Sequence, residues 1–231
     1  MLGKGNIIAA AAILLATNAA MAADSVDVKV IGTIVPAACK PALAGGDTID
    51  YGTIKASAIN MDDYTSLPIK TVEFSIKCDA PSKVAIRSID LQKDSRVIPV
   101  GQKALDGKTY TATSKYIAGL GSDNGKKVGG YGMILIGTDV TIDGSITPGV
   151  IFSDNNGASW NGGTSNFGAW ITPGTSNYTY SFSKDGENTP LAFTTLTGTL
   201  QTQAYINKGS ELDLTKAVHL NGQTTIELYY L

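Results

Sequence analysis

Hydrophobic and polar residues alternate with a period of two in several stretches of the chain. These stretches are residues 26–34, 71–77, 83–89, 131–136, 191–206 and 224–230. Such alternation predicts β-strands with one buried face, and the Gly, Asn, Asp and Pro clusters between them predict turns. Beyond the N-terminal segment, no stretch keeps a helical apolar period over 12 residues, and only residues 55–65 suggest a short helix. The pattern predicts an all-β, antiparallel β-sandwich.

The last predicted strand reaches the end of the sequence. Ile226, Leu228 and Tyr230 fall on one face of this strand, and Leu231 is the final residue. Chain ends fray unless they are tied into a sheet, so a strand this apolar is expected to pair with a neighbour. The sequence leaves open whether that neighbour comes from the same chain or from another one.

The first 22 residues have the layout of a secretory signal peptide. Lys4 is an early cation, residues 7–16 are apolar, and residues 20–22 give the small-residue pattern that signal peptidase accepts. The apolar run is too short to span a bilayer. We expect cleavage after Ala22 or Ala23 and export to the periplasm; the alternative is a retained N-terminal helix.

Residues 23–231 are expected to form a single domain, because this length supports one large core. This part holds 17 basic and 20 acidic residues, a net charge of −3, once Lys4 is removed with the signal peptide. No basic stripe is visible, which argues against nucleic acid and anionic membranes as partners. No second long apolar stretch follows, so no membrane insertion is expected after cleavage.

The chain has two cysteines, Cys39 and Cys78. In an exported protein an even cysteine count predicts a disulfide. Each cysteine follows an alternating stretch, so the bond would join two strands and stabilise the fold by about 2–4 kcal/mol. Free thiols, metal binding or redox catalysis would call for a CxxC motif, nearby histidines or a basic setting, and the sequence has none of these.

Two stretches rich in Gly, Asn, Ser and Thr, residues 119–130 and 154–177, are expected to be long loops or hairpin tips. If exposed there, Trp160, Trp170 and Tyr178 would suit stacking on sugars or proteins. Aromatic residues in all-β proteins more often pack within the fold, and this second interpretation is favoured.

Residues 153–160 read Ser-Asp-Asn-Asn-Gly-Ala-Ser-Trp and resemble the Asp-box turn, with Asn155 in place of the usual aspartate. The motif predicts a β-hairpin turn held by side-chain hydrogen bonds. Sialidase-like propellers repeat this turn in every blade, whereas it occurs here once. A single copy therefore predicts a hairpin and not a glycosidase.

Residues that could carry catalysis are scattered. The one histidine, His219, stands without a triad motif, and the chain lacks HExxH, P-loop and GxSxG signatures. Asp62 and Asp63 fall in a polar turn, and residues 123–125 read as a turn and not as a calcium loop. We expect no catalytic residues, no metal, no cofactor and no enzymatic activity.

Three segments and the terminal strand carry a resemblance to a known family. Residues 26–39 alternate and end in Gly-Thr-Ile-Val-Pro-Ala-Ala-Cys, residues 50–54 read Asp-Tyr-Gly-Thr-Ile, and residues 78–85 read Cys-Asp-Ala-Pro-Ser-Lys-Val-Ala. Together with the penultimate tyrosine of the last strand, these segments resemble chaperone–usher fimbrial subunits. The similarity is greatest to the beta-fimbria or GltF-like family of periplasmic and fimbrial proteins.

This resemblance implies an incomplete immunoglobulin-like sandwich that lacks its seventh strand and assembles by β-strand addition. Residues 23–35 would be the donor strand of another subunit, with Val26, Val28, Val30 and Gly32 on its inserted face. Ile226, Leu228, Tyr230 and Leu231 would form the edge that a periplasmic chaperone or the next subunit covers.

The implied partners are that chaperone, an outer-membrane usher and other fimbrial subunits, and the implied role is structural, with a contribution to cell adhesion. A second hypothesis keeps residues 26–34 within a complete sandwich. The protein would then be a soluble periplasmic binding or accessory protein that does not polymerise.

Overall fold

The computed structural model describes residues 28–33, 38–145, 147–166, 168–171 and 178–231. The chain divides into two units, residues 1–35 and residues 36–231. In the first unit, residues 28–33 have no strand conformation, so the strand predicted there is not formed over these residues. The predicted signal peptide, the two predicted cleavage sites and Val26 lie outside the described residues.

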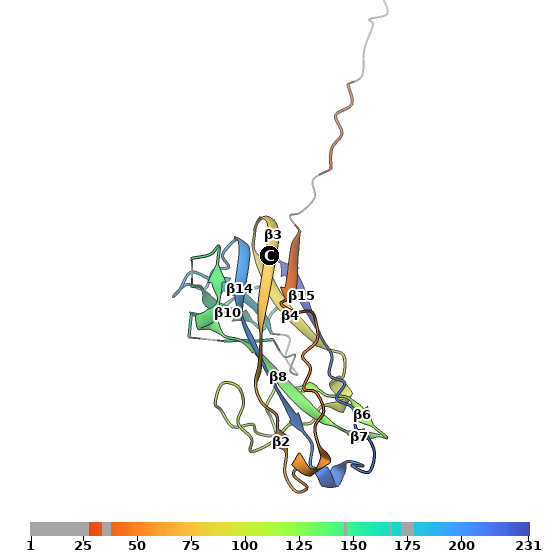
Figure 1. The fold of residues 1–231 in the computed structure, drawn as a ribbon. Coiled ribbons are helices and arrows are strands. Elements are labelled where there is room, and N and C mark those ends of the chain that lie inside the picture. Colours follow the sequence, from red (N-terminus) through yellow and green to blue (C-terminus); the bar gives the residue numbers. More distant parts are fainter. Residues whose placement is uncertain (1–27, 34–37, 146, 167, 172–177) are drawn as a thin grey trace, which may run out of the picture. The chain divides into compact units, whose positions relative to one another are not determined.

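The second unit contains an eight-stranded antiparallel sheet whose long central strand is β14 (Figure 1). The order of the main strands is β1-β3-β14-β8-β12, while β2 and β9 pair with β14 and β5 pairs with β8. The bounds are Cys39–Leu43 for β1, Thr65–Ser66 for β2, Lys70–Ser82 for β3, Ala118–Gly119 for β5, Gly129–Leu135 for β8, Thr141–Ile142 for β9, Ala169–Trp170 for β12 and Phe193–Ile206 for β14.

A second antiparallel sheet has five strands in the order β11-β10-β13-β4-β15. Its strands are β4 (Val84–Asp90), β10 (Gly149–Ser153), β11 (Asn161–Thr164), β13 (Thr179–Ser183) and β15 (Thr224–Tyr230). A small ribbon joins β6 (Ser122–Asp123) to β7 (Lys126–Lys127), and the short 3-10 helices are η1 (Ala56–Ala58), η2 (Lys93–Ser95), η3 (Gly137–Asp139) and η4 (Gly209–Glu211). None of the described residues belongs to a helix long and apolar enough to traverse a membrane.

The inward faces of the two sheets share one hydrophobic core. Phe74 and Leu196 come from the larger sheet, and Ile86 and Phe182 come from the smaller one. The rings of Phe182 and Phe193 meet edge to face with centroids 6.2 Å apart. The prediction of an all-β antiparallel sandwich is confirmed.

Five of the predicted strands are present in the second unit. They correspond to β3, β4, β8, β14 and β15. The helix predicted over residues 55–65 is wrong, because only the 3-10 turn Ala56–Ala58 forms. The side chain of Asn60 accepts hydrogen bonds from the N–H groups of Asp62 and Asp63, and this local turn ends the helical conformation.

Candidate functional site

The two sheets have their end strands on the same side of the sandwich. In the described part of the chain, β15 pairs with β4 alone and β1 pairs with β3 alone. The two end strands meet where the N–H of Cys39 donates a hydrogen bond to the Tyr230 hydroxyl, 2.7 Å away. Each strand therefore has an edge without a strand partner, which is the feature that β-strand addition uses.

A groove lies between the segment that follows β1 and the segment that precedes β15. Its first hollow, of about 620 Å³, lies between Leu43 and Ile226, with Met133 and Leu200 among the residues that line it. Met133 and Leu200 belong to the buried core. Side chains of the buried core thus form part of the lining of the groove.

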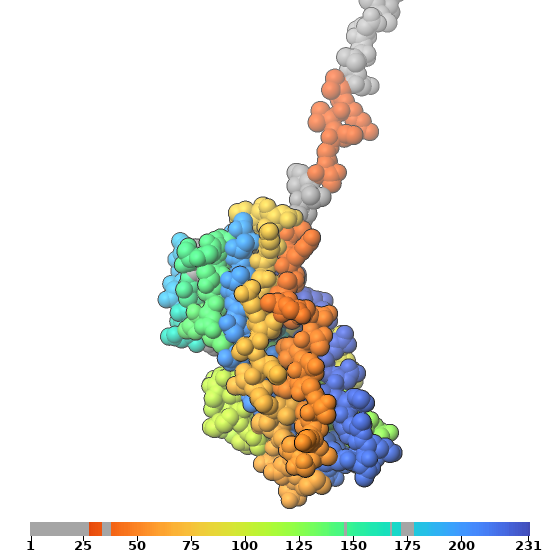
Figure 2. All heavy atoms as spheres, in the orientation of Figure 1, coloured from red at the N-terminus to blue at the C-terminus, as the bar shows by residue number. Residues whose placement is uncertain are grey.

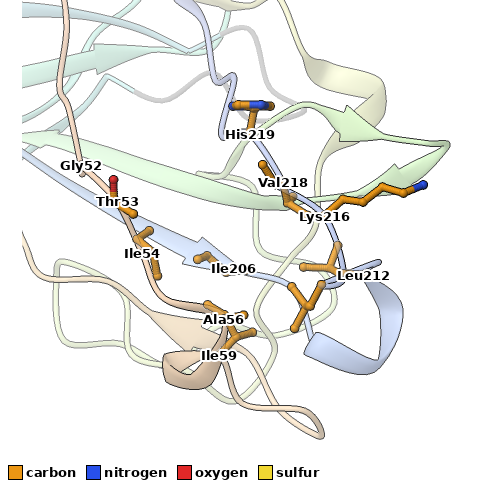
Figure 3. Close-up of a pocket in the computed structure, with 12 residues that line it drawn as sticks. Gly52, Thr53, Ile54, Ala56, Ile59, Ile206, Leu212, Lys216, Val218 and His219 are labelled. Atoms are coloured by element: carbon orange, nitrogen blue, oxygen red, sulfur yellow. The ribbon is translucent and has the colours of Figure 1, made fainter.

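A second hollow, of about 380 Å³, adjoins the first one, and both are lined by Gly52, Val218 and His219. Figure 3 shows Ile54, Ile59, Ile206 and Leu212 converging from three segments of the chain, while the Lys216 side chain extends away from them. In Figure 2 the orange segment that includes residues 47–59 runs beside the blue C-terminal segment. The two hollows thus extend along one side of the sandwich.

Local sequence explains why the flank after β1 is not a strand. Gly45, Gly46 and Gly52 have φ angles of 80°, 102° and 65°, a region that favours glycine and interrupts extended backbone. Tyr51 then fixes this segment to β14, because its hydroxyl donates to the Thr202 carbonyl (3.2 Å) and accepts from the Ala204 N–H (3.1 Å). Burial raises the pKa of Tyr51, so the hydroxyl keeps its proton at neutral pH.

The opposite flank ends in β15, whose start is tied to the larger sheet. The hydroxyls of Tyr131 and Thr224 share a hydrogen bond 2.5 Å long. Burial raises the pKa of Tyr131 to about 12, which keeps this phenol protonated. Between η4 (Gly209–Glu211) and β15 the chain makes a turn and then runs without regular secondary structure over residues 217–223.

The sequence placed Ile226, Leu228 and Tyr230 on one face of the terminal strand. In the structure Ile226 and Leu228 are half-buried against the core. Tyr230 reaches Cys39 and is 46% exposed, while Leu231, whose N–H donates to the Lys83 carbonyl, follows the strand and is 45% exposed. Their role as a docking edge remains a prediction.

The predicted donor residues that the structure describes lie in the first unit. Val28 and Val30 are 82% and 91% exposed, and Ile31 is 79% exposed. A side chain added at Gly32 would meet no atom within 4 Å. These apolar side chains are therefore not used in a core, although their role as a donor strand is untested.

The predicted disulfide between Cys39 and Cys78 is present, with the two Cα atoms 3.9 Å apart. It fixes β1 to β3 at the point where Cys39 contacts Tyr230. The bond agrees with export, because disulfides persist in oxidising compartments.

The aromatic residues considered for surface recognition have different environments. Trp170 is buried and stacks on Tyr116 with ring centroids 5.0 Å apart, so a surface role for Trp170 is wrong. Tyr178 is half-buried and meets Phe152 edge to face at 5.5 Å. Trp160 is half-buried next to Gly157. The favoured interpretation, packing within the fold, holds for Trp170, because its ring stacks on Tyr116 and lies against β8 at Gly132.

The Asp-box-like turn forms the predicted hairpin between β10 and β11. The Ser153 hydroxyl donates to the side-chain oxygen of Asn155 (2.8 Å) and accepts from the N–H of Gly157 (2.8 Å). Asn155 also bonds Ser159 through its side-chain nitrogen (2.8 Å). Asparagine thus serves as the turn's central hydrogen-bonding residue.

The remaining polar candidates do not gather into one place. His219 lines the groove, whereas Asp62 and Asp63 lie in an exposed turn more than one hundred positions away in sequence. Within the described ranges, no three His, Cys, Asp or Glu side chains cluster so as to hold a metal ion. The groove is therefore the candidate binding site.

Comparison with known proteins places the chain in a family. Protein GltF of Escherichia coli (strain K12) is 30% identical over 246 residues, which cover 96% of this chain and 95% of GltF. The chain belongs to the GltF family. A second relative, the uncharacterized protein YhcF of the same organism, is 27% identical over 227 residues, covering 92% of this chain and 93% of YhcF.

Residues 28–132 match the family described as "Protein of unknown function (DUF1120)". The matched part of this GltF-family chain includes β1, β3 and β4 and most of the flank that follows β1. The GltF-like part of the resemblance is thus confirmed, while the names of the two relatives state no activity.

Proposed function

We propose that this GltF-family protein is a structural subunit of a chaperone–usher fimbria, assembled by donor-strand complementation and contributing to adhesion. The observation that carries the proposal is the groove between β1 and β15, which core residues such as Met133 and Leu200 line. A groove lined by apolar residues is a typical place for a partner to bind, and an added β-strand also satisfies the free backbone groups of both edges.

The exposed residues 28–33 supply the second part of the proposal. Val28 and Val30 are apolar, alternate with polar positions and are exposed. An extended strand places such residues on one face, where they would fill the groove of another subunit. Burying each valine contributes about 1.5–3 kcal/mol at most, so two or three valines can hold a strand in place.

The proposal assigns partners and excludes a catalytic role. A periplasmic chaperone would cover the groove before assembly, an outer-membrane usher would export the subunit, and other subunits would supply and receive donor strands. The export expected from the signal peptide and the Cys39–Cys78 disulfide supports a periplasmic stage. No reaction step, cofactor or metal is assigned to the chain.

The test uses the full chain, exported to the periplasm with and without a co-expressed chaperone. Light scattering after size-exclusion chromatography and gel electrophoresis without heating would report the assembled mass. The Val28→Asp, Val30→Asp double variant should abolish the heat-sensitive multimers, because a buried carboxylate opposes insertion. Val100→Asp is the matched control, since Val100 is exposed in a loop of the second unit.

The opposite result would support the soluble accessory protein of the second hypothesis. Such a protein would stay monomeric at all concentrations, need no chaperone, and respond no more to the double variant than to Val100→Asp.

A further inference from the structure

Glu227 occupies a distinctive position on the candidate edge strand β15. It lies between the half-buried Ile226 and Leu228 and is itself exposed. Successive side chains of a strand point to opposite faces, so Glu227 faces outward while its two neighbours face the core. Its outward position places a negative charge directly above the free edge of the sheet.

A cation lies beside Glu227 on the neighbouring strand β4, away from the free edge. Arg87 is its pairing partner on β4, but its guanidinium donates to the Asn156 side chain and lies 6.0 Å from the Tyr229 ring centre. Among the described residues, Glu227 has no ion pair within 4 Å. The carboxylate is therefore free to meet a cation that arrives at the open edge.

Residues 28–30 of the first unit have the complementary pattern. Lys29 stands between Val28 and Val30, and all three side chains are exposed. In an extended strand the two valines would share one face and Lys29 the other. Residues 28–30 therefore form an apolar, cationic, apolar triplet, and residues 226–228 of β15 form an apolar, anionic, apolar triplet.

The two triplets match in either strand direction. If Val28 and Val30 enter the groove beside Ile226 and Leu228, the central residue Lys29 comes to the side of Glu227. Directly opposed residues on neighbouring strands have Cβ atoms about 4.5–5.5 Å apart. The centre of each triplet pairs with the centre of the other, whether the strands run parallel or antiparallel.

We propose that Glu227 selects the donor strand by charge, and that the strand it fits is residues 28–30 of a second copy of this chain. The inference rests on the proposed function, because it requires that the groove accept a strand. It adds that the subunit recognises itself. Arg87, Glu227 and the incoming Lys29 would form an alternating row of charges across three adjacent strands.

Such self-recognition is a heterologous contact. One surface of the subunit binds a different surface of the next, so the contact can repeat without closing and generate a fibre. Like charges directly opposed in a sheet are destabilising, so a donor with an acidic residue between its two apolar positions would be rejected. Charge thus gives specificity, while apolar burial gives affinity.

A charge swap in the full exported chain tests the proposal. Lys29→Glu and Glu227→Lys should each raise the concentration needed for assembly by about three- to tenfold, because attraction becomes repulsion. The double swap should return that concentration to within about twofold of the unmodified chain. Size-exclusion chromatography with light scattering over a dilution series measures the concentration.

Controls separate the charge effect from folding. Lys126→Glu and Glu187→Lys change the same charges at exposed positions away from β15 and should leave assembly unchanged. Because Glu227→Lys adds a cation beside Arg87, the thermal midpoint of each variant is measured as a monomer. Glu227→Gln, which adds no repulsion, should give a smaller loss.

The outcomes distinguish the two levels of the proposal. Recovery in the double swap supports self-recognition through Glu227. Assembly that is lost in the Val28→Asp, Val30→Asp variant but unaffected by the charge changes overturns this inference and leaves donor-strand assembly standing. Single variants that fail without recovery in the double swap also overturn it. An unmodified chain that never assembles overturns both the inference and the proposed function.

Discussion

The two faces of the larger sheet differ in how they are covered. On the outer face the chain covers β14 itself: Tyr205 is buried and packs edge to face against Tyr110, with ring centroids 5.4 Å apart. Together with Ile117, these two tyrosines form a second buried hydrophobic cluster, separate from the core between the sheets. On the inner face, Leu200 of the same strand lines an open groove.

Specific contacts hold the outer covering in place. Asp90, the last residue of β4, forms an ion pair with Arg96 at 3.0 Å and accepts the N–H of Gly119 at 3.1 Å, which ties the early part of the following loop and strand β5 to the end of β4. Gly130 lets the loop approach, because a Cβ there would lie 2.5 Å from the Val97 carbonyl oxygen. No comparable loop segment spans the groove in the described part of the chain.

The difference shows that the protein has segments long enough to cover one face of the sheet, although none of the described segments covers the groove. About 27 residues between β4 and β5 cover one face of the larger sheet, whereas the segments that line the groove, residues 47–52 and 218–223, have no strand conformation. The contacts that cover the closed face all come from the same chain. Under the proposed function, a partner strand would add buried area on the groove side.

Tyr205→Ala is expected to have the largest effect, because it leaves a cavity in the hydrophobic cluster on the closed face. It removes a buried ring and its hydroxyl, whose one proton lies within reach of two acceptors, the Lys103 carbonyl (2.8 Å) and the side-chain oxygen of Gln203 (2.7 Å). Loss of a large core aromatic costs about 3–5 kcal/mol. Urea unfolding measures the loss, and a change below about 1 kcal/mol would show that the outer cluster contributes little.

Cys39→Ser is expected to weaken the groove side by about 2–4 kcal/mol, since the bond restrains the unfolded chain and holds β1 against β3. Reducing the unmodified protein should give the same loss. The check is denaturant unfolding with and without reductant, with Cys39→Ser, Cys78→Ser as the matched double variant. Equal unfolding midpoints in all samples would mean that the disulfide does not contribute to the stability of the fold.

Gly130→Ala tests the close approach on the closed face. The added methyl group would lie 2.5 Å from the Val97 oxygen and 2.6 Å from Ile117, so the loop must move. Overpacking of this kind costs about 1–3 kcal/mol. Gly32→Ala is the control, because its new Cβ meets no atom within 4 Å, and a thermal scan compares the two.

Tyr230→Ser should cost about 1 kcal/mol, because it removes the hydroxyl that accepts the Cys39 N–H. Under the proposed function it should also weaken chaperone binding and strand assembly. Tyr229→Ser is the matched control, since Tyr229 is equally exposed but lies on the opposite face of β15. Similar assembly in both variants would argue against a docking role for Tyr230.

The sequence identified the five strands of seven or more residues, including β8, which is buried at all seven positions, and missed two shorter buried strands. β3 and β15 alternate visibly, but β13 is buried at all five positions and β10 at four of five. Burial on both faces removes the period of two. Their aromatic and β-branched residues, as in Thr179–Ser183, were the remaining signal.

The groove was predicted from the family resemblance and not from the alternation. Its position depends on where strands stop, which is set by glycine conformations at Gly45 and Gly46 and by the hydrogen bonds of Tyr51. β1 was missed because Pro41 and Ala42 give no strand pattern, and its place is fixed by pairing with β3 and by the disulfide. Such long-range contacts are invisible in a local pattern.

Asp143→Asn should have the smallest effect and reports on β14, which both faces share. One carboxylate oxygen of Asp143 accepts hydrogen bonds from Thr194 and Thr195 at the start of β14. The Thr194 hydroxyl and the Thr195 N–H are the main groups that lower the pKa of Asp143. A lowered pKa contributes stability above the unfolded value, near pH 4, and that contribution is lost as the pH falls through the folded pKa.

Asparagine tolerates the left-handed backbone of position 143 (φ 48°), so Asp143→Asn tests the charge itself. Because Asp143 is exposed, solvent screening limits its contribution, and we expect the thermal midpoint to fall by about 2 °C or less at pH 7. The difference should shrink towards zero at pH 3, where the carboxylate is increasingly protonated. Asp94→Asn, an exposed substitution outside this contact, is the control. A difference that persists unchanged at pH 3 would mean that geometry at the turn, and not the charge of Asp143, holds the start of β14 in place.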